Sequence, residues 1–432
     1  MLCVLLQVLR TDDKQHTRLP AAAATKYIFS AMWTPVIMLL LGGFAIAAAL
    51  SKYGIAKSMA TYIISKAGTK PRNVLLMNMF VAMVASMWIS NVAAPVLCFS
   101  IIQPVLRTLP ADSPFAKSLI IGIALASNIG GMASPIASPQ NVVALQNMHP
   151  TPSWGEWFFV ALPVCLLGIF GIWLLLLVSY KPGISCPYIV DFAAKGIAIA
   201  PIRPTKDPFS GTQYFISFIT VFTIGLWCVE HQIEPLFGDM GVIAIIPLVM
   251  FFGTGILTKE DFNNFLWTVI ILAMGGIALG KAVSSSGLLA TIADEIRHAV
   301  AGMGLFSVLV VFAALILVVA TFISHTVAAL IVMPIVAQVG GEMDDPHPRL
   351  LIMGAALMCS GAMGLPMSGY LLWLKRIADH RFPNMTAIMM ENEVGVRYLS
   401  VKDFLKTGVP ASIITFVIVV LVGYTLMRIV GF

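Results

Sequence analysis

Two stretches of the sequence place small polar residues in the middle of long apolar runs. The first, 86–95, reads Ser-Met-Trp-Ile-Ser-Asn-Val-Ala-Ala-Pro and lies inside an apolar run from 74 to 109. The second, 320–329, reads Ala-Thr-Phe-Ile-Ser-His-Thr-Val-Ala-Ala. A membrane helix can be interrupted only where protein or a ligand satisfies the freed backbone groups. Both stretches therefore predict a helix that stops, presents its backbone ends to a ligand and restarts.

The composition fits a membrane setting for these runs. Of the 432 residues, 59% are hydrophobic and 11% are charged, whereas soluble domains carry roughly 25% charged residues. The apolar runs have the length of membrane helices rather than of barrel strands. The net charge of +6 is spread over loops without a basic, aromatic-rich patch, so nucleic acid is not an expected partner. We predict an all-α, polytopic membrane protein.

No pattern in the chain is typical of an enzyme. The six cysteines lie apart and mostly in apolar runs, so we expect buried thiols rather than disulfides or metal ligands. No nucleophile is recognisably paired with a base, and no HExxH zinc motif occurs. We therefore expect neither catalysis nor a bound cofactor.

The apolar run at 74–109 is too short for two membrane crossings. Each arm beside its polar tip is about 15 residues long, whereas a spanning helix needs about 20. We predict a re-entrant hairpin of two half-helices there. The run at 305–340, which surrounds the second polar stretch, predicts a second re-entrant hairpin.

Each predicted hairpin precedes an apolar run that prolines and small polar residues interrupt. The run 117–148 breaks at 133–141, which contains Pro135 and Pro139, and the run 350–391 breaks from Gly364 onward. Proline lacks the backbone donor and clashes with the preceding turn. We predict two broken membrane helices at these positions.

The two halves of the chain resemble each other at a nearly constant spacing. The Gly-Gly pair at 42–43 lies 233 positions before the pair at 275–276, and Met132 lies 231 positions before Met363. Weak matches at one spacing over so long a stretch indicate an internal repeat.

The two copies are expected to face opposite ways. If the hairpins do not cross the membrane, an odd number of steps from one membrane span to the next leads from the span 27–50 to its copy 265–283. The two copies then have opposite orientations in the membrane, which is the inverted repeat of many secondary transporters. Lys and Arg residues gather in loops that should be cytosolic, namely 51–116, 181–211, 258–264 and 391–407. The first hairpin would then enter from the cytosol, the second from the other side, and the C-terminus would be non-cytosolic.

The expected organisation follows from these elements. It comprises a truncated N-terminal remnant and loop (1–26), a first membrane repeat (27–180) with its hairpin (74–109) and broken helix (117–148), a cytosolic linker (181–211), and a second membrane repeat (212–432) with its hairpin (305–340) and broken helix (350–391).

A charged segment, 370–381, interrupts the second broken helix. Each charge near the middle of a membrane costs roughly 2.5–3.5 kcal/mol. Without this segment Ser368 and Gly369 run directly into 382–384, which matches 136–141 with a one-residue gap. We interpret 370–381 as an aberrant insert from a gene-model or splicing artefact rather than as a regulatory loop.

Several of these stretches resemble the divalent anion/sodium symporter family, and most closely its fungal low-affinity phosphate transporters, which include a vacuolar exporter. The matching stretches are 87–98, 124–132, 138–141, 280–287, 324–329 and 362–366. The resemblance implies a secondary transporter that moves inorganic phosphate with sodium as the coupling ion. It also implies a homodimer embedded in membrane lipid, in the vacuolar membrane with the plasma membrane as the alternative, and an SPX domain in full-length members.

Alternative functions stay open at this point. A sulfate or dicarboxylate transporter of the same family is one, and an inactive truncated paralogue is another. The family signature at the hairpin tips is Ser-Asn-Thr, whereas the tips here read Ser90-Asn91-Val92 and Ser324-His325-Thr326. These departures argue against a dicarboxylate and favour the phosphate branch.

Helix N-termini can hold an oxyanion without a buried cation, because their free N–H groups carry partial positive charge. The candidate phosphate-binding residues at the tips and breaks are Ser90, Asn91, Ser138, Pro139, Asn141, Ser324, His325, Thr326, Gly369, Pro383 and Asn384. By resemblance, one sodium site would use Ser86, Ser90, Asn91 and Ala137, and the other Ala320, Ser324, His325 and Ser368. His325 could equally be a packing residue, a phosphate donor or a proton-coupling group. Lys281, near the end of a span, is expected to snorkel to the membrane surface.

Overall fold

The structure is a computed structural model that describes most of the chain. The described residues are 2–5, 7–10, 17–68, 70–91, 93–107, 109, 113–181, 208–287, 302–343, 345–365, 383–392 and 395–432. In this part of the chain the regular structure is helical, with two isolated β-bridges. Five of its helical stretches are long and apolar enough to cross a membrane. The predicted all-α, polytopic membrane fold is confirmed.

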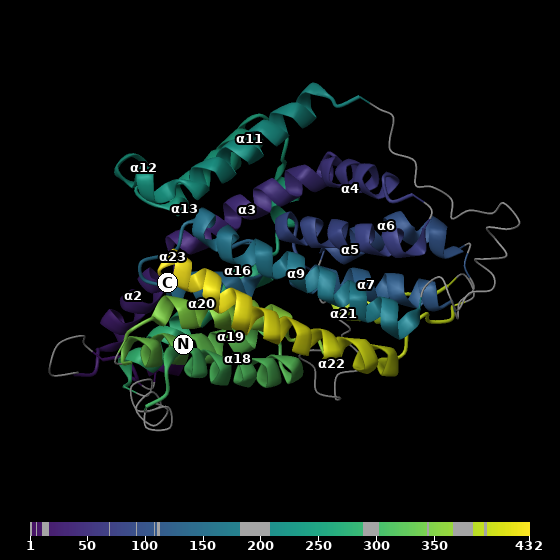
Figure 1. Cartoon of the computed structure of the whole chain (residues 1–432). Coiled ribbons are helices and arrows are strands. Elements are labelled where there is room, and N and C mark those ends of the chain that lie inside the picture. Colours follow the sequence, from purple (N-terminus) through teal and green to yellow (C-terminus); the bar gives the residue numbers. More distant parts are fainter. Residues whose placement is uncertain are drawn as a thin grey trace, which may run out of the picture.

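The first half of the chain contains a hairpin of half-helices followed by a broken helix (Figure 1). The hairpin is α5 and α6, joined through 89–92, and the broken helix is α7 and α8, separated by 131–138. The elements in order are α1 (Leu2–Leu5), α2 (Ala21–Met32), α3 (Pro35–Lys52), α4 (Ile55–Ser65), α5 (Pro71–Trp88), α6 (Ala93–Arg107), α7 (Pro114–Gly130), α8 (Pro139–Asn147) and α9 (Trp154–Tyr180).

The described part of the second half repeats this order after four additional helices. The additional helices are α11 (Gly211–Cys228), α12 (Glu230–Phe237) and α13–α14 (Met240–Ile243 and Ile245–Gly253). The repeated elements are α15 (Lys259–Asn263), α16 (Trp267–Ser285), the hairpin α18–α19 (Leu305–Phe322 and His325–Gly341), the broken helix α20 and α21 (Pro348–Gly361 and Pro383–Ile388), and the last span α22 (Val401–Ile418), a π-helical turn (Val419–Gly423) and α23 (Tyr424–Val430). Figure 1 places the α5–α6 hairpin toward one end of the molecule and the α18–α19 hairpin toward the other.

Several helix boundaries differ from the sequence expectation. The first span starts at Ala21 rather than 27 and is interrupted before Pro35, because proline takes the first position of α3 and Thr34 before it is extended. The stretch 230–240 contains α12, which meets α13–α14 at a bend of 79°. The last span starts at Val401, because Ser400 and Asp403 form a capping box there, so the expected loop 391–407 is partly helical. The segment 370–381 and most of the predicted linker lie outside the described residues.

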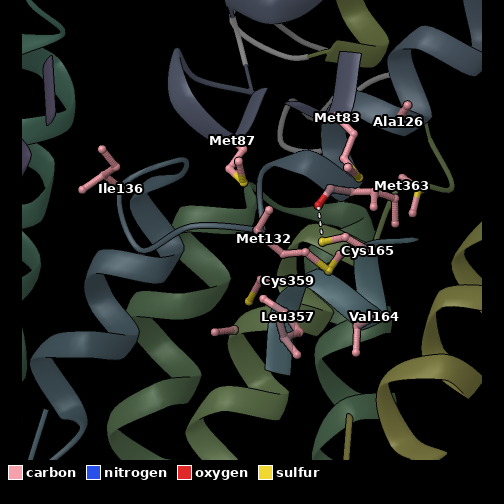
Figure 2. Close-up of a cluster of buried hydrophobic side chains, with 14 of the residues drawn as sticks. Met83, Met87, Ala126, Met132, Ile136, Val164, Cys165, Leu357, Cys359 and Met363 are labelled. Atoms are coloured by element: carbon pink, nitrogen blue, oxygen red, sulfur yellow. Dashed lines mark hydrogen bonds between the residues drawn. The ribbon is translucent and has the colours of Figure 1, made fainter. Parts of the chain in front are cut away.

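The two repeats are interlocked rather than placed side by side. Helix α8 of the first repeat packs against α19 and α20 of the second, and α21 of the second packs against α6 and α7 of the first. Each broken helix therefore lays its second half on the hairpin of the other repeat. Met132 and Met363, which correspond in the internal repeat, belong to one cluster of buried side chains with Met83 and Cys165 (Figure 2).

Candidate functional site

The first break is held open by side-chain hydrogen bonds to its backbone. Asn141 Nδ2 donates to the carbonyl oxygens of Gly131 and Ser134, both at 2.8 Å. Ser134 Oγ in turn donates to the carbonyl of Met87, on the last turn of α5, at 2.7 Å. The unwound segment is therefore fixed in shape and attached to the first hairpin.

The tip of the first hairpin lies directly against this break. The backbone N–H of Asn91 donates to the Ala137 carbonyl at 3.4 Å. A Cβ atom on Gly131 would lie 2.7 Å from Ser138 Oγ and 3.1 Å from Asn91 Cβ, so the tip and the break meet at that glycine. Ser90 and Asn91 are both buried, and Ser90 has a φ of 155°, a strained value for a non-glycine residue.

Ser86 lies one turn before the first tip and is fully buried. Its Oγ donates to the carbonyl of Ser127 in α7 at 2.7 Å. A Cβ atom on Gly130 would lie 2.7 Å from Ser86 Cβ, which shows how closely α5 and α7 approach. The structure thus brings together Ser86, Ser90, Asn91 and Ala137, the four residues expected at the first sodium site.

The second tip contacts the second break through a side chain. Ser324 is the N-cap of α19, and its side chain makes no capping hydrogen bond. His325 begins α19 and places Nε2 2.9 Å from the carbonyl of Ala362 in the second break. Thr326 and Ala320 are buried beside it. Ser368 and Gly369, predicted for this half of the site, lie outside the described residues.

Asn384 joins the second break to the first repeat. Its Nδ2 donates to the carbonyls of Met363 and Leu365 at 3.2 and 3.0 Å, as Asn141 does to its own break. Its Oδ1 accepts from Asn128 Nδ2 of α7 at 2.8 Å. A second hydrogen bond also joins the two repeats. Gln140 Nε2 of α8, in the first repeat, donates to Ser360 Oγ of α20, in the second, at 2.8 Å.

These two crossing bonds are related by the internal repeat. Ser360 lies 232 positions after Asn128, which matches the spacing of the repeat. Gln140 and Asn384 both follow the proline that begins the second half of a broken helix. One bond joins the end of α7 to the start of α21, and the other joins the end of α20 to the start of α8. All four side chains are buried.

Two polar atoms at the first break lack partners among the described residues. Ser138 Oγ and Asn141 Oδ1 are both buried without a hydrogen bond. Ser138 is the N-cap of α8 but makes no side-chain capping bond, Pro139 has no N–H, and the N–H of Asn141 donates to the Ser138 carbonyl at 3.1 Å. In the described part of the chain the one charged residue in the buried class is Glu230, on α12. The site thus offers neutral donors and acceptors without a buried cation.

Sequence reasoning missed Gly131, Asn128, Gln140 and Ser360 as parts of this arrangement. Gly131, Asn128 and Gln140 lie in stretches that carry the family resemblance, 124–132 and 138–141. The family resemblance indicated these stretches but not the residues within them that form hydrogen bonds between the two repeats. Ser360 had no signal beyond its position in the internal repeat.

Cavities approach the site from one end of the molecule. One cavity of about 450 Å³ lies between α8, α16 and α19, and its walls include Val143 and Leu330, two and five residues beyond Asn141 and His325. A second cavity of about 670 Å³ extends from there toward α2, α3 and α12. At the base of the first hairpin, a cavity of about 140 Å³ lies beside Arg107 and Glu391.

Comparisons with known proteins bear on this architecture. A family model described as a citrate transporter matches residues 1–356 and 239–430. An uncharacterized transporter of Schizosaccharomyces pombe is 61% identical over 429 residues, which are 99% of this chain and 47% of that protein. The inorganic phosphate transporter PHO87 and the low-affinity phosphate transporter PHO90 of Saccharomyces cerevisiae are 47% and 48% identical, over 98% and 99% of this chain and 43% and 46% of their own.

Two more distant proteins are similar to this chain, one in sequence and one in fold. The sodium-dependent dicarboxylate transporter SdcS of Staphylococcus saprophyticus is 24% identical over 91% of this chain and 76% of its own. The crystal structure of the YdaH transporter of Alcanivorax borkumensis superposes with a TM-score of 0.56 at 11% identity, covering 99% of this chain and 95% of that one.

The chain spans about half the length of the fungal relatives it matches, at 43–47% of theirs. Those with an assigned activity are named as phosphate transporters. The family model extends over nearly the whole sequence. The chain belongs to the citrate transporter family, and the resemblance to the divalent anion/sodium symporter family and its fungal phosphate branch is confirmed.

Proposed function

We propose that this chain carries the transport unit of a secondary active transporter for inorganic phosphate. Two relatives that match nearly its full length are named as phosphate transporters. The site chemistry supports an oxyanion, because the tips and breaks supply hydroxyls, amides and helix N-termini, which bind phosphate without a buried cation.

The observation that carries the proposal is the pair of unpartnered polar atoms at the first break. Ser138 Oγ and Asn141 Oδ1 are buried without a described partner, and burial of such groups costs free energy unless a ligand satisfies them. Ser138 Oγ can donate to a phosphate oxygen, whereas Asn141 Oδ1 can accept from a protonated one or coordinate a cation. The phosphate-binding residues that we propose are Ser90, Asn91, Ser138, Pro139, Asn141, Ser324, His325, Thr326, Gly369, Pro383 and Asn384.

Sodium is the proposed coupling ion. Hard cations prefer oxygen ligands, and the contact of Asn91 with the Ala137 carbonyl gathers such oxygens near Ser86. The sodium dependence in the name of SdcS supports this choice. The proposed second sodium site, which includes Ala320, Ser324, His325 and Ser368, would use the second tip. Bound sodium would offset the charge of phosphate in the membrane interior.

The cellular setting of the proposal is export of phosphate from the vacuole to the cytosol, with the C-terminus on the non-cytosolic side and the protein as a homodimer. The bias of Lys and Arg toward the loops 51–116 and 181–211 supports the orientation. Protease protection of a C-terminal tag in intact vacuoles would check it.

Transport by the purified chain in proteoliposomes tests the function. We expect uptake of labelled phosphate that rises with an inward sodium gradient and is competed poorly by sulfate, succinate and citrate. The variant Asn141→Ala should reduce this uptake, and Lys402→Gln, an exposed substitution on α22, should not. Uptake of labelled succinate or citrate without phosphate uptake would instead assign the chain to a carboxylate, which the family description and SdcS make the second candidate.

A further inference from the structure

The two larger cavities meet around a single lysine. The cavity of about 450 Å³ and the cavity of about 670 Å³ share four described lining residues, Gln146, His149, Ile277 and Lys281. Lys281 comes from α16, and Gln146 lies on α8. The cavities therefore form one continuous vestibule, with Lys281 at the passage between its two chambers.

The inner chamber lies next to the proposed phosphate site. Its walls include Val143 and Leu330, on the half-helices that begin beside Ser138 and at His325. Lys281 therefore lies in the wall of a cavity that reaches within two residues of Asn141 and five residues of His325 along their helices. The sequence expectation that Lys281 only snorkels does not account for its position in the walls of both chambers.

The charges around the vestibule are arranged unevenly. Among its described lining residues, Lys281 is the one Lys or Arg. The outer chamber also carries Glu230, His231, Glu234 and Asp239, which lie on or beside α12. Their carboxylates repel an anion, and the inner chamber has no acidic residue among its described walls. An anion must therefore pass an acidic outer wall to reach a basic inner one, which makes the lysine charge important for entry.

Neutral donors complete the environment of Lys281. Gln146 Nε2 is buried and has no hydrogen-bond partner among the described residues. Asn147 and Gln338 also line the inner chamber, as does His149. A flexible ammonium group with amide donors nearby is a common way to hold a phosphate oxyanion as a point charge.

We propose that the inner chamber of the vestibule is a second, transient oxyanion site, in which Lys281 and Gln146 hold a phosphate group before it reaches the hairpin tips. This inference rests on the proposed phosphate transport. In this proposal Lys281 affects the rate and affinity with which phosphate enters from one side of the membrane. Lys281 does not contact the phosphate that is bound at the tips.

The test compares Lys281→Gln and Lys281→Arg with the wild type and with Lys402→Gln as the matched control on another exposed lysine. Phosphate exchange is measured in proteoliposomes from each side in turn. We expect Lys281→Gln to raise the KM for phosphate about fivefold to tenfold at low ionic strength and less than about twofold at 0.5 M salt, where charges are screened within a few ångströms. With kcat retained, the same rise in KM should be seen in both directions of transport, because a substitution must change kcat/KM for influx and efflux by the same factor, and Lys281→Arg should be close to wild type.

Each other outcome separates the hypotheses. If wild-type protein exchanges phosphate but Lys281→Gln keeps the wild-type KM and salt dependence, the vestibule site is wrong and the proposed function stands. A rise in KM that 0.5 M salt does not reduce and that Lys281→Arg also shows would assign Lys281 a general structural role and also overturn the inference. Wild-type protein that exchanges no phosphate would overturn the proposed function itself. In lipid-free detergent, inorganic phosphate should raise the Tm of wild type more than that of Lys281→Gln; a difference seen only with anionic lipid would identify a lipid headgroup instead.

Discussion

The two repeats build the same elements and tie them together differently. In the first repeat, the Asn141 side chain donates to two carbonyl groups of the break, which extends from Gly131 to Ser138. In the second repeat, Asn384 holds the carbonyls of Met363 and Leu365 and also accepts a bond from Asn128 of the other repeat. The tips differ as well, because Asn91 contacts its break through the backbone and His325 through its ring.

The access routes differ in the same way. At the base of the second hairpin the cavity of about 450 Å³ lies between parts of α19 and α16. At the base of the first hairpin the cavity is about 140 Å³ and its described walls do not include α3, the counterpart of α16. The two copies of one unit therefore differ in the cavities beside their hairpins, as they would in an alternating-access transporter built from an inverted repeat.

The largest expected effect comes from removing the amides that hold the breaks. Asn384→Ala deletes three hydrogen bonds and Asn141→Ala deletes two. Bonds between membrane helices are worth about 0.6 kcal/mol each, so Asn384→Ala should lower the free energy of unfolding by about 2 kcal/mol and Asn141→Ala by about 1 kcal/mol. Both should reduce kcat/KM for phosphate by about 100-fold, because the donors at the breaks are displaced.

Unfolding in detergent with urea and phosphate flux in proteoliposomes would measure these two quantities. The ranking sharpens the comparison between the repeats, since only Asn384 also serves the other repeat. A larger stability loss for Asn141→Ala than for Asn384→Ala would contradict the role of Asn384 as the joint between them.

Gly131→Ala tests why the first break needs a glycine. The counterpart before Met363 is Ala362, so the substitution gives the first repeat the residue of the second. The new Cβ would lie 2.7 Å from Ser138 Oγ and displace that hydroxyl. We expect the KM for phosphate to rise about tenfold, which corresponds to one lost hydrogen bond of about 1.4 kcal/mol.

Gly211→Ala is the matched control, because nothing lies within 4 Å of its Cβ position. Flux at varied phosphate concentration measures both variants. An unchanged KM in Gly131→Ala would mean that Ser138 does not contact the substrate.

The sequence predicted the membrane helices, the two hairpins and the positions of the polar tips because these features depend on local composition and on the length of apolar runs. It also paired Asn141 with Asn384 through the repeat. It did not predict that Asn384 would reach Asn128 or that Gln140 would reach Ser360, because these bonds depend on how the broken helices cross. Nor did it place Lys281 in a vestibule, since the ends of α8 and α16 meet only in the tertiary structure.

The crossing bonds should be coupled by a measurable amount. In a double-mutant cycle of Gln140→Ala and Ser360→Ala, we expect a coupling energy of about 0.6–1.7 kcal/mol, the range found for hydrogen bonds between membrane helices. The equivalent cycle with Asn128→Ala and Asn384→Ala should give a similar value if the pseudo-twofold relation holds. Additive effects in either cycle would show that this bond does not join the repeats.

The glycines that correspond in α3 and α16 differ in how closely their surroundings are packed. A Cβ atom on Gly42 would lie 2.7 Å from the Ala244 carbonyl oxygen, whereas nothing lies within 4 Å of the Cβ position of Gly275. Gly42→Ala should therefore destabilise the protein by about 1–3 kcal/mol through overpacking. Gly275→Ala should leave stability unchanged or raise it by up to about 1 kcal/mol through helix propensity. Urea unfolding of the two variants measures the difference. Equal losses would mean that α16 is packed as tightly as α3, and the open side of the molecule would then need another explanation.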